Sequence, residues 1–243
     1  MIDDQWLRWA ELADLKKKGL LQEVEAVQRG GAVDGDSLWV QFYRASQGRQ
    51  ARALFTVALT AFAGDGFDPA GAQAVDLGCG DGTETAALLA QGWYVLAIDQ
   101  EPAAIASVIA KAPAAAQPRL QARAVAFEAV ELPAAHFVYA GVSLPFCAPE
   151  HFPGLWAKVV KCLRPGGRFA GHFFGERDGW HADTKMTFHT VPDVQRLFTG
   201  FTVESFVEVE EDKPSALGEM KHWHSIEVVA RRRAAPGAKN ATA

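Results

Sequence analysis

The feature that most constrains the fold of this chain is a glycine-rich turn between an apolar strand and a helical stretch, at residues 74–85. Asp76 stands between apolar residues in the strand, and glycines follow at alternate positions, Gly78, Gly80 and Gly82. Glycine permits backbone angles and a close ligand approach that a Cβ would block. The N-terminus of the next helix favours an anionic group. The stretch therefore predicts an α/β fold that binds a small charged molecule at the end of this strand.

A second apolar strand, residues 93–98, stops at Asp99. In a parallel sheet this carboxylate lies at the same edge as the glycine turn, one strand across. It lies roughly twenty residues beyond the turn, as in a βαβ unit. A carboxylate there accepts hydrogen bonds from both hydroxyls of a ribose. The alternative is a solvated Asp that opens a turn before Pro102, but together with the glycine turn the pattern favours a nucleoside ligand.

The spacing of the glycines distinguishes two nucleotide-binding families. The dinucleotide fingerprint G-x-G-x-x-G is not met, because its third position falls on Thr83. The pattern D-x-G-x-G-x-G from Asp76 to Gly82 instead resembles motif I of the class I S-adenosylmethionine-dependent methyltransferases. A second motif of that family, L-x-P-G-G, occurs at residues 163–167 before a strand. Residues from about 72 to 175 are similar to the family in order and spacing.

The resemblance implies an α/β fold with a doubly wound, Rossmann-like, seven-stranded mixed sheet, its last strand antiparallel and helices on both faces. It places the methyltransferase domain at residues 66–232. Residues 1–65, which are helical in pattern, are expected to form an N-terminal helical segment that acts as a lid. Residues 233–243, rich in Ala with Pro and Gly, are expected to be a disordered tail.

The resemblance also assigns residues to the cofactor, S-adenosyl-L-methionine. Arg44 would meet the methionine carboxylate, which a guanidinium matches with two hydrogen bonds. Phe127 would cover the adenine ring and Glu128 would accept from its amine, in place of the commoner Asp. Ser143 follows the fourth strand. The expected cofactor-binding set is Arg44, Asp76, Gly78, Cys79, Gly80, Asp99, Gln100, Phe127, Glu128 and Ser143.

The acceptor side is expected around the segment after the fourth strand, Ser143-Leu144-Pro145-Phe146. The segment lacks the Asn or Asp that orients a target amine in relatives that modify nucleic acids or glutamine, and so indicates an apolar floor. Because the last strand of this fold runs antiparallel, its beginning lies at the active-site edge, with the acidic run Glu210–Lys213, expected as a loop, close by. The expected substrate residues are Phe146, Trp180, His181 and Lys221.

His222 is the candidate catalytic residue. A histidine beside the acceptor acts as a general base if the acceptor is a hydroxyl or a protonated amine, whereas a thiolate or chalcogen anion needs no base. His222 and His224 alternate on a strand, which puts both on one face. Two ligands without a third do not make a zinc site, so no metal is predicted.

Composition limits the alternatives. The 243 residues are 49% hydrophobic and 22% charged, as in one globular domain. A net charge of −5 argues against a nucleic-acid partner. The three widely spaced cysteines suggest a reducing compartment. The acidic N-terminus and the lack of a membrane-length apolar run make a cytoplasmic location the expectation.

The sequence thus predicts an S-adenosylmethionine-dependent methyltransferase that moves a methyl group to an O, N or S/chalcogen atom of a small molecule by in-line displacement. The general pattern is similar to the tellurite-resistance type and other small-molecule methyltransferases. Three alternatives stay open: an RNA or protein methyltransferase, a non-catalytic S-adenosylmethionine-binding protein, and an aminopropyl transferase. A carboxylate-binding Arg44 would argue against the third.

Overall fold

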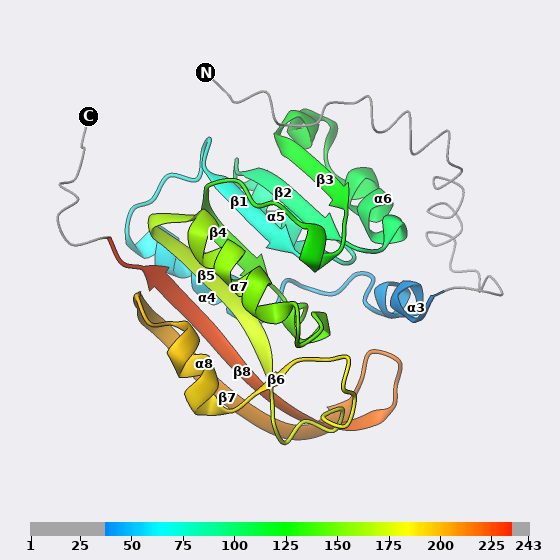
Figure 1. Cartoon of the computed structure of the whole chain (residues 1–243). Coiled ribbons are helices and arrows are strands. Elements are labelled where there is room, and N and C mark those ends of the chain that lie inside the picture. The colour runs from blue at the N-terminus through cyan, green and yellow to red at the C-terminus, as the bar shows by residue number, and fades with distance from the viewer. Residues whose placement is uncertain (1–36, 235–243) are drawn as a thin grey trace.

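The computed structural model describes residues 37–234, in which one mixed sheet carries helices on both faces (Figure 1). The predicted helix at residues 1–29 and the tail from 235 onward lie outside the described residues. The strand order is β3-β2-β1-β4-β5-β8-β7, and a short β6 pairs with β5. The strands are β1 (Gln73–Leu77), β2 (Tyr94–Asp99), β3 (Leu120–Ala124), β4 (Ala135–Ala140), β5 (Leu163–Gly175), β6 (Phe188–His189), β7 (Phe201–Pro214) and β8 (Met220–Arg232).

The first five strands of the order β3-β2-β1-β4-β5 are parallel, and β8 runs antiparallel to both β5 and β7. The predicted Rossmann-like sheet with an antiparallel last strand is therefore confirmed, with β6 as an addition to its seven strands. The carboxyl ends of the parallel strands meet at one edge, where ligands bind in this kind of sheet.

Successive side chains of each strand point to opposite faces of the sheet, and they pack into two apolar cores, one on each face. In β1, Ala74 belongs to the core beneath α4 and α5, whereas Val75 belongs to the core beneath α7 and α8. Figure 1 shows α4 on one side of the sheet and α7 and α8 on the other. The helices are α3 (Leu38–Ala45), α4 (Ala53–Gly64), α5 (Thr83–Ala90), α6 (Pro102–Lys111), α7 (Phe152–Cys162) and α8 (Val191–Leu197), with 3-10 turns η1 (Ala114–Arg119), η2 (Phe127–Ala129) and η3 (Leu144–Phe146).

The chain enters the sheet through α3 and α4. The helical pattern that the sequence splits at Gly48 corresponds to these two helices, and Gly48 has φ 75° in the connection between them. Ser37 caps α3 by accepting a hydrogen bond from the amide of Val40. The connection, residues 46–52, crosses the carboxyl edge of the sheet and carries two arginines into the site described below.

The hairpin of β7 and β8 is longer than the sequence indicates. The run Glu210–Lys213, expected as an acidic loop, belongs to β7, and its residues pair with His224 through Lys221 of β8. Acidic residues have low strand propensity, which is why the pattern ended the strand early. Arg177 offsets part of the acidic charge, since its Nη2 lies 2.7 Å from both Glu208 and Glu210.

Candidate functional site

A cavity of about 570 Å³ opens at the carboxyl edge of the sheet, beneath α3 and the connection to α4. This is within the size range of small-molecule sites, about 300–1,000 Å³. The glycine turn and Asp99 line one end of it, and aromatic side chains line the other. Of the predicted site residues, it brings together Asp76, Gly78, Cys79, Gly80, Asp99, Gln100, Phe127, Glu128, Ser143, Phe146 and Trp180.

The glycine turn has the shape that only glycine adopts easily. Gly78, Gly80 and Gly82 have φ of 78°, 50° and 80°. Space is equally restrictive, because a Cβ on Gly78 would lie 2.2 Å from the Cβ of Ser143. The turn therefore presents bare backbone to the cavity.

Asp99 closes β2 with a carboxylate that is only 5% exposed. Its oxygens accept hydrogen bonds from the amides of Gly80 at 2.9 Å and Glu101 at 3.0 Å. The hydroxyl of Tyr43 donates to both oxygens. Burial raises the pKa of the Asp99 carboxyl, although these hydrogen bonds oppose the shift. The backbone of the turn thus fixes the position of the Asp99 carboxylate.

Asp76 lies deeper in the same wall. Thr85 Oγ1 donates to it at 2.6 Å, and the side chain is 2% exposed. Burial, and then the charge of Glu84, raise the pKa of Asp76 to about 7. Asp76 is thus a buried carboxyl beneath the turn, with little surface toward the cavity.

The cations at the cavity are not the one expected from the sequence. Arg44, at the end of α3, does not line the cavity, whereas Arg49 and Arg52 do. The guanidinium of Arg49 grips the buried Glu84 through Nη1 at 2.7 Å and Nη2 at 2.5 Å, and Nη2 also meets Asp81 at 3.0 Å. The guanidinium of Arg52 lies 4.0 Å from Oε1 of Glu84, and the backbone amide of Arg52 donates to the same oxygen at 3.1 Å.

The turn after β4 is strained. Val142 has φ 58°, a region that a β-branched residue rarely adopts. Next to it the buried hydroxyl of Ser143 donates to the carbonyl of Leu77, which ties this turn to the end of β1. Strain of this kind clusters at ligand-binding sites. The tie holds Ser143 against Gly78 in the cavity wall.

Aromatic rings form a continuous wall at the other end. The Phe146 ring meets that of Trp39 edge-on at 4.5 Å and that of Trp180 at 6.4 Å between centroids. Trp180 continues to Trp223 at 5.6 Å, with Phe174 beside both. All five rings line the cavity.

Lys221 supports this wall from behind and does not line the cavity. Its buried ammonium lies 3.7 Å from the ring centroid of Trp223 and 4.4 Å from that of Trp180, and it pairs with Asp178 at 2.5 Å. These distances are those of cation–π contacts. Burial lowers the pKa of Lys221, and Asp178 opposes the shift.

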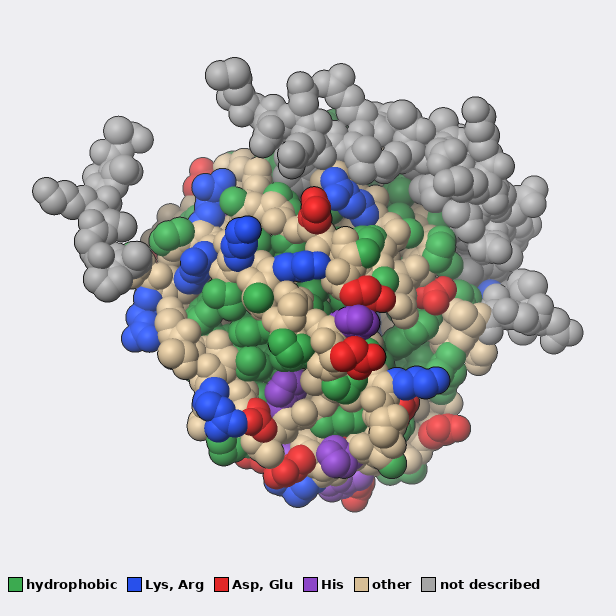
Figure 2. All heavy atoms as spheres, viewed as in Figure 1, with side chains coloured by type: hydrophobic (Ala, Val, Ile, Leu, Met, Phe, Trp, Pro, Cys, Tyr) green, Lys and Arg blue, Asp and Glu red, His purple; other side chains and the backbone are tan. Residues whose placement is uncertain are grey.

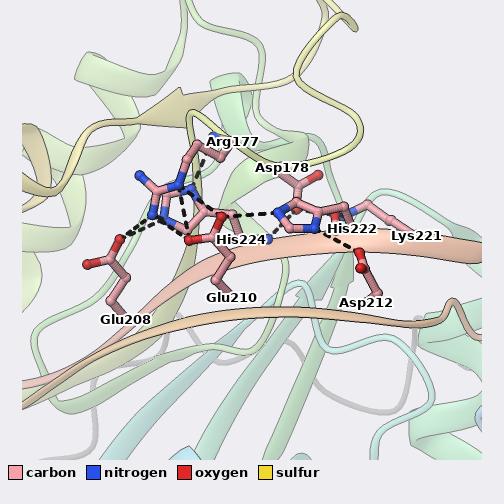
Figure 3. A network of polar contacts seen from close by, with 8 residues as sticks. All are labelled: Arg177, Asp178, Glu208, Glu210, Asp212, Lys221, His222 and His224. Atoms are coloured by element: carbon pink, nitrogen blue, oxygen red, sulfur yellow. Dashed lines mark hydrogen bonds and ion pairs between the residues drawn. The ribbon is translucent and has the colours of Figure 1, made fainter.

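The structure places His222 and His181 outside the cavity wall as well. His222 and His224 share a face of β8, as predicted (Figure 3). Trp223, between them in the sequence, lines the cavity from the opposite face. His222 is 40% exposed and contacts Asp212 and Glu210, which raise its pKa. His181 is exposed. The face of β8 that reaches the cavity is the odd-numbered one.

His224 is buried in the same network and holds the turn after β5 (Figure 3). Its Nδ1 accepts from the amide of Arg177, so the proton lies on Nε2, 3.0 Å from Glu208. Glu208, Glu210 and His224 group as three metal ligands would, but the Arg177 guanidinium already contacts all three. A cation is therefore already supplied to this cluster by the chain.

Two further cavity residues belong to no motif and are not among the expected cofactor, substrate or catalytic residues. His172 on β5 is 6% exposed, and Tyr139 on β4 is 1% exposed. Both line the cavity. The Nδ1 of His172 and the hydroxyl of Tyr139 have no hydrogen-bond partner among residues 37–234. A lone histidine inside an apolar strand gives no signal in the sequence that distinguishes it from a core residue.

Comparison with known proteins relates this arrangement to methyltransferases. Residues 74–167 match the model of a methyltransferase domain. No curated protein sequence matches the chain. The resemblance to S-adenosylmethionine-dependent methyltransferases predicted from the sequence is confirmed by the domain match and by the fold of the similar structures.

Among similar solved structures is TehB from Haemophilus influenzae, with a TM-score of 0.61, 14% identity, and coverage of 79% of this chain and 67% of that one. Another is the 1,6-didemethyltoxoflavin-N1-methyltransferase from Burkholderia thailandensis, with a TM-score of 0.56, 21% identity, and coverage of 96% of this chain and 98% of that one. A third is the magnesium protoporphyrin IX methyltransferase of Synechocystis with bound S-adenosylmethionine, with a TM-score of 0.57, 14% identity, and coverage of 95% of this chain and 100% of that one. At these identities the likeness establishes the fold.

Proposed function

Since residues 74–167 match the model of a methyltransferase domain, we propose that this chain uses S-adenosylmethionine to methylate a small organic molecule at the aromatic end of its cavity. One observation carries the proposal: a single cavity joins the glycine turn and Asp99 to the wall of Phe146, Trp180 and Trp223. The cofactor and the acceptor would therefore share one enclosed space.

The residues at the polar end fit the cofactor. Asp99 would accept from the two ribose hydroxyls, and the bare backbone at Gly78 would lie beside the ligand. Phe127 and Glu128, both at the cavity, would meet the adenine ring as the resemblance implies. Arg52 replaces Arg44 as the candidate partner of the methionine carboxylate, because it reaches the cavity while Arg49 is held by Glu84.

We also propose that the segment before the sheet covers the ligand. Trp39, Tyr43, Arg49 and Arg52 all line the cavity, and they come from α3 and the connection to α4. The contact of Tyr43 with Asp99 ties this segment to the expected ribose position. This fits the expected role of residues 1–65 as a lid, for the part from residue 37 onward.

The acceptor end favours a small molecule with an apolar, flat body. Tryptophan and phenylalanine rings bind such surfaces by stacking and by excluding water. The Burkholderia protein in the comparison was crystallised with the small molecule that it is named for, 1,6-didemethyltoxoflavin. The charge of this chain, −5, gives no general attraction for nucleic acid. Figure 2 shows histidine and acidic side chains gathered at the lower edge of the view, where Figure 1 has the β7–β8 hairpin.

For methyl transfer, the main contribution of the protein would be to align the bound cofactor and the bound acceptor. The cofactor supplies a methyl group on a positively charged sulfur, ready for in-line displacement. Holding both reactants in line contributes on the order of 7–11 kcal/mol in favourable cases. The aromatic wall next to the reacting atoms favours a cation and keeps water out.

The test is methyl transfer from S-adenosylmethionine carrying a labelled methyl group to a panel of flat phenols, amines and thiols, with RNA and a denatured protein mixture as comparisons. We expect label in one class of small molecule. Label only in RNA or protein would overturn the acceptor class. Binding of S-adenosylmethionine without transfer to any acceptor would indicate a non-catalytic binding protein.

A further inference from the structure

Four polar side chains form a stepped row across the cavity face of neighbouring strands, with a step of two residues between β4 and β5, where Tyr139 is level with Ala170. They are Asp76 on β1, Tyr139 on β4, His172 on β5 and Glu227 on β8. The register pairs Asp76 with Tyr139, and it sets His172 directly across from Glu227. The row lies on a single face because side chains of a strand alternate between the two faces.

His172 stands where the acceptor is expected. The pairing of β4 with β5 ends at Ala140 and Gly171, so His172 lies just beyond it, beside the strained turn of Gly141 and Val142. That turn and Ser143 line the cavity between its polar and aromatic ends. Phe174, two residues further along the same face of β5, belongs to the aromatic wall. His172 is therefore located at the junction of the two ends.

The two ring nitrogens of His172 have different surroundings. Nε2 lies 3.5 Å from Oε1 of Glu227, and Nδ1 has no partner among the described residues although the side chain is only 8% exposed. A carboxylate at Nε2 favours the tautomer with the proton there, which leaves the lone pair on Nδ1. The contact with His172 lowers the pKa of Glu227, so this carboxylate is ionised at neutral pH.

We propose that His172 is the general base of the methyl transfer and Glu227 its positioning residue, and that the acceptor is therefore a neutral hydroxyl or amine that must lose a proton. The inference rests on the methyltransferase function proposed above. The acceptor atom bonds to the methyl carbon, the carbon–sulfur bond breaks and sulfur keeps its electron pair. The acceptor proton passes to Nδ1 of His172, and the imidazolium that results is paired with Glu227.

Two other titratable groups of the row, Tyr139 and Asp76, share this face of the sheet with His172, and Arg49 and Arg52 line the cavity from the segment above. Burial raises the pKa of Tyr139 well above its usual value, so it stays a neutral phenol. Asp76, with its raised pKa, is bonded to Thr85. Glu227 is thus the charged partner in contact with His172.

The test compares 2-naphthol with 2-naphthalenethiol, flat acceptors that differ in one atom, in mildly alkaline buffer where the thiol is largely ionised. General-base catalysis contributes about 10²–10⁴-fold, so His172→Gln should reduce methylation of the naphthol by at least about 100-fold. Methylation of the thiolate should be nearly unchanged, since it has no proton to lose. His222→Gln, an exposed histidine on the neighbouring strand, is the matched control and should preserve both rates.

A second measurement needs neither acceptor nor cofactor. Nitrogen NMR of the protein labelled at histidine should show His172 as the Nε2–H tautomer, and Glu227→Gln should weaken that preference. Equal losses for both acceptors, activity with thiolates alone, or a His172 protonated at Nδ1 would overturn the proposal. Failure to bind S-adenosylmethionine would instead contradict the function on which it rests.

Discussion

The hydroxyl of Tyr43 donates to both carboxylate oxygens of Asp99, at 3.0 and 3.2 Å. A residue of α3 thus occupies the two acceptors that a ribose would use. On the proposed function, the cofactor would displace this hydrogen bond when it binds. The segment above the cavity and the end of β2 are coupled by this contact.

Replacing Tyr43 with Phe should strengthen cofactor binding. A hydrogen bond contributes about 1 kcal/mol net, and in the variant the ligand no longer has to break the bond between Tyr43 and Asp99. The Kd for S-adenosylhomocysteine should therefore fall by up to about fivefold. Calorimetric titration of both proteins measures this. Weaker binding by the variant would show that the hydroxyl contacts the ligand instead of competing with it.

Replacing Asp99 with Ala should weaken the binding of S-adenosylhomocysteine by about 1.5–3 kcal/mol in the same titration, because charge-assisted hydrogen bonds to the ribose are lost. Asp183→Ala, which removes an exposed aspartate near the aromatic end, is the control. An unchanged Kd for Asp99→Ala would remove this residue from the binding site.

Arg52 and Arg44 can be separated by choice of ligand. Arg52→Met should weaken the binding of S-adenosylhomocysteine by about 1.5–3 kcal/mol. The binding of 5′-methylthioadenosine, which lacks the carboxylate, should be nearly unchanged. Arg44→Met should change neither, because Arg44 does not line the cavity. The reverse pattern would restore the assignment made from the sequence.

The contrast between these arginines shows what the sequence could and could not predict. The turn at Gly78, the acid at Asp99 and the positions of the strands along the chain followed from spacing, because short-range periodicity determines these elements. The mixed sheet with its antiparallel last strand followed from the resemblance to the family. Arg52 was missed because residues 46–52 are irregular, and no periodicity tells which side chain of such a segment turns toward the sheet. The helix α3 ends at Ala45 and leaves Arg44 off the cavity wall.

The acceptor side was harder to predict for a related reason. Strand alternation placed His222 and His224 together correctly, but which face of β8 meets the cavity depends on its pairing with β5. That pairing turns Trp223 and Glu227 toward the cavity. It also brings Glu227 across from His172, although the two residues are 55 positions apart in the sequence. Contacts of this range leave no local pattern.

The ion pair of Arg49 with Glu84 should carry part of the stability. Glu84 is 4% exposed at the side chain and Arg49 23%. Arg49→Leu would leave two buried carboxylates, Glu84 and Asp81, without their shared partner, at a cost of about 3–5 kcal/mol. Urea unfolding measures the loss. The exposed pair of Arg196 with Asp193 is the control, and Arg196→Leu should cost less than about 1 kcal/mol. Similar losses in both variants would contradict the role given to Arg49.

Asp76 should make stability depend on pH. Its pKa is about 7 when folded, and about 3.9 is usual for an unfolded chain. Between these values the unfolded state releases the proton that the folded state keeps, so this group's contribution to stability falls as pH rises from about 4 to about 7. Urea unfolding of wild type and Asp76→Asn near both limits isolates the effect. We expect the variant to lose less stability over this range, and equal slopes would contradict the raised pKa.

The central claim is that the cavity between Asp99 and the aromatic wall binds S-adenosylmethionine. The most direct measurement is thermal unfolding with S-adenosylmethionine, S-adenosylhomocysteine and NAD, each over a concentration series. At 100 times its Kd a ligand of the folded state adds about 2.7 kcal/mol, which such a scan resolves. We predict a rise in Tm with the two sulfur nucleosides and none with NAD. A rise with NAD alone, or with none of the three, would contradict the account.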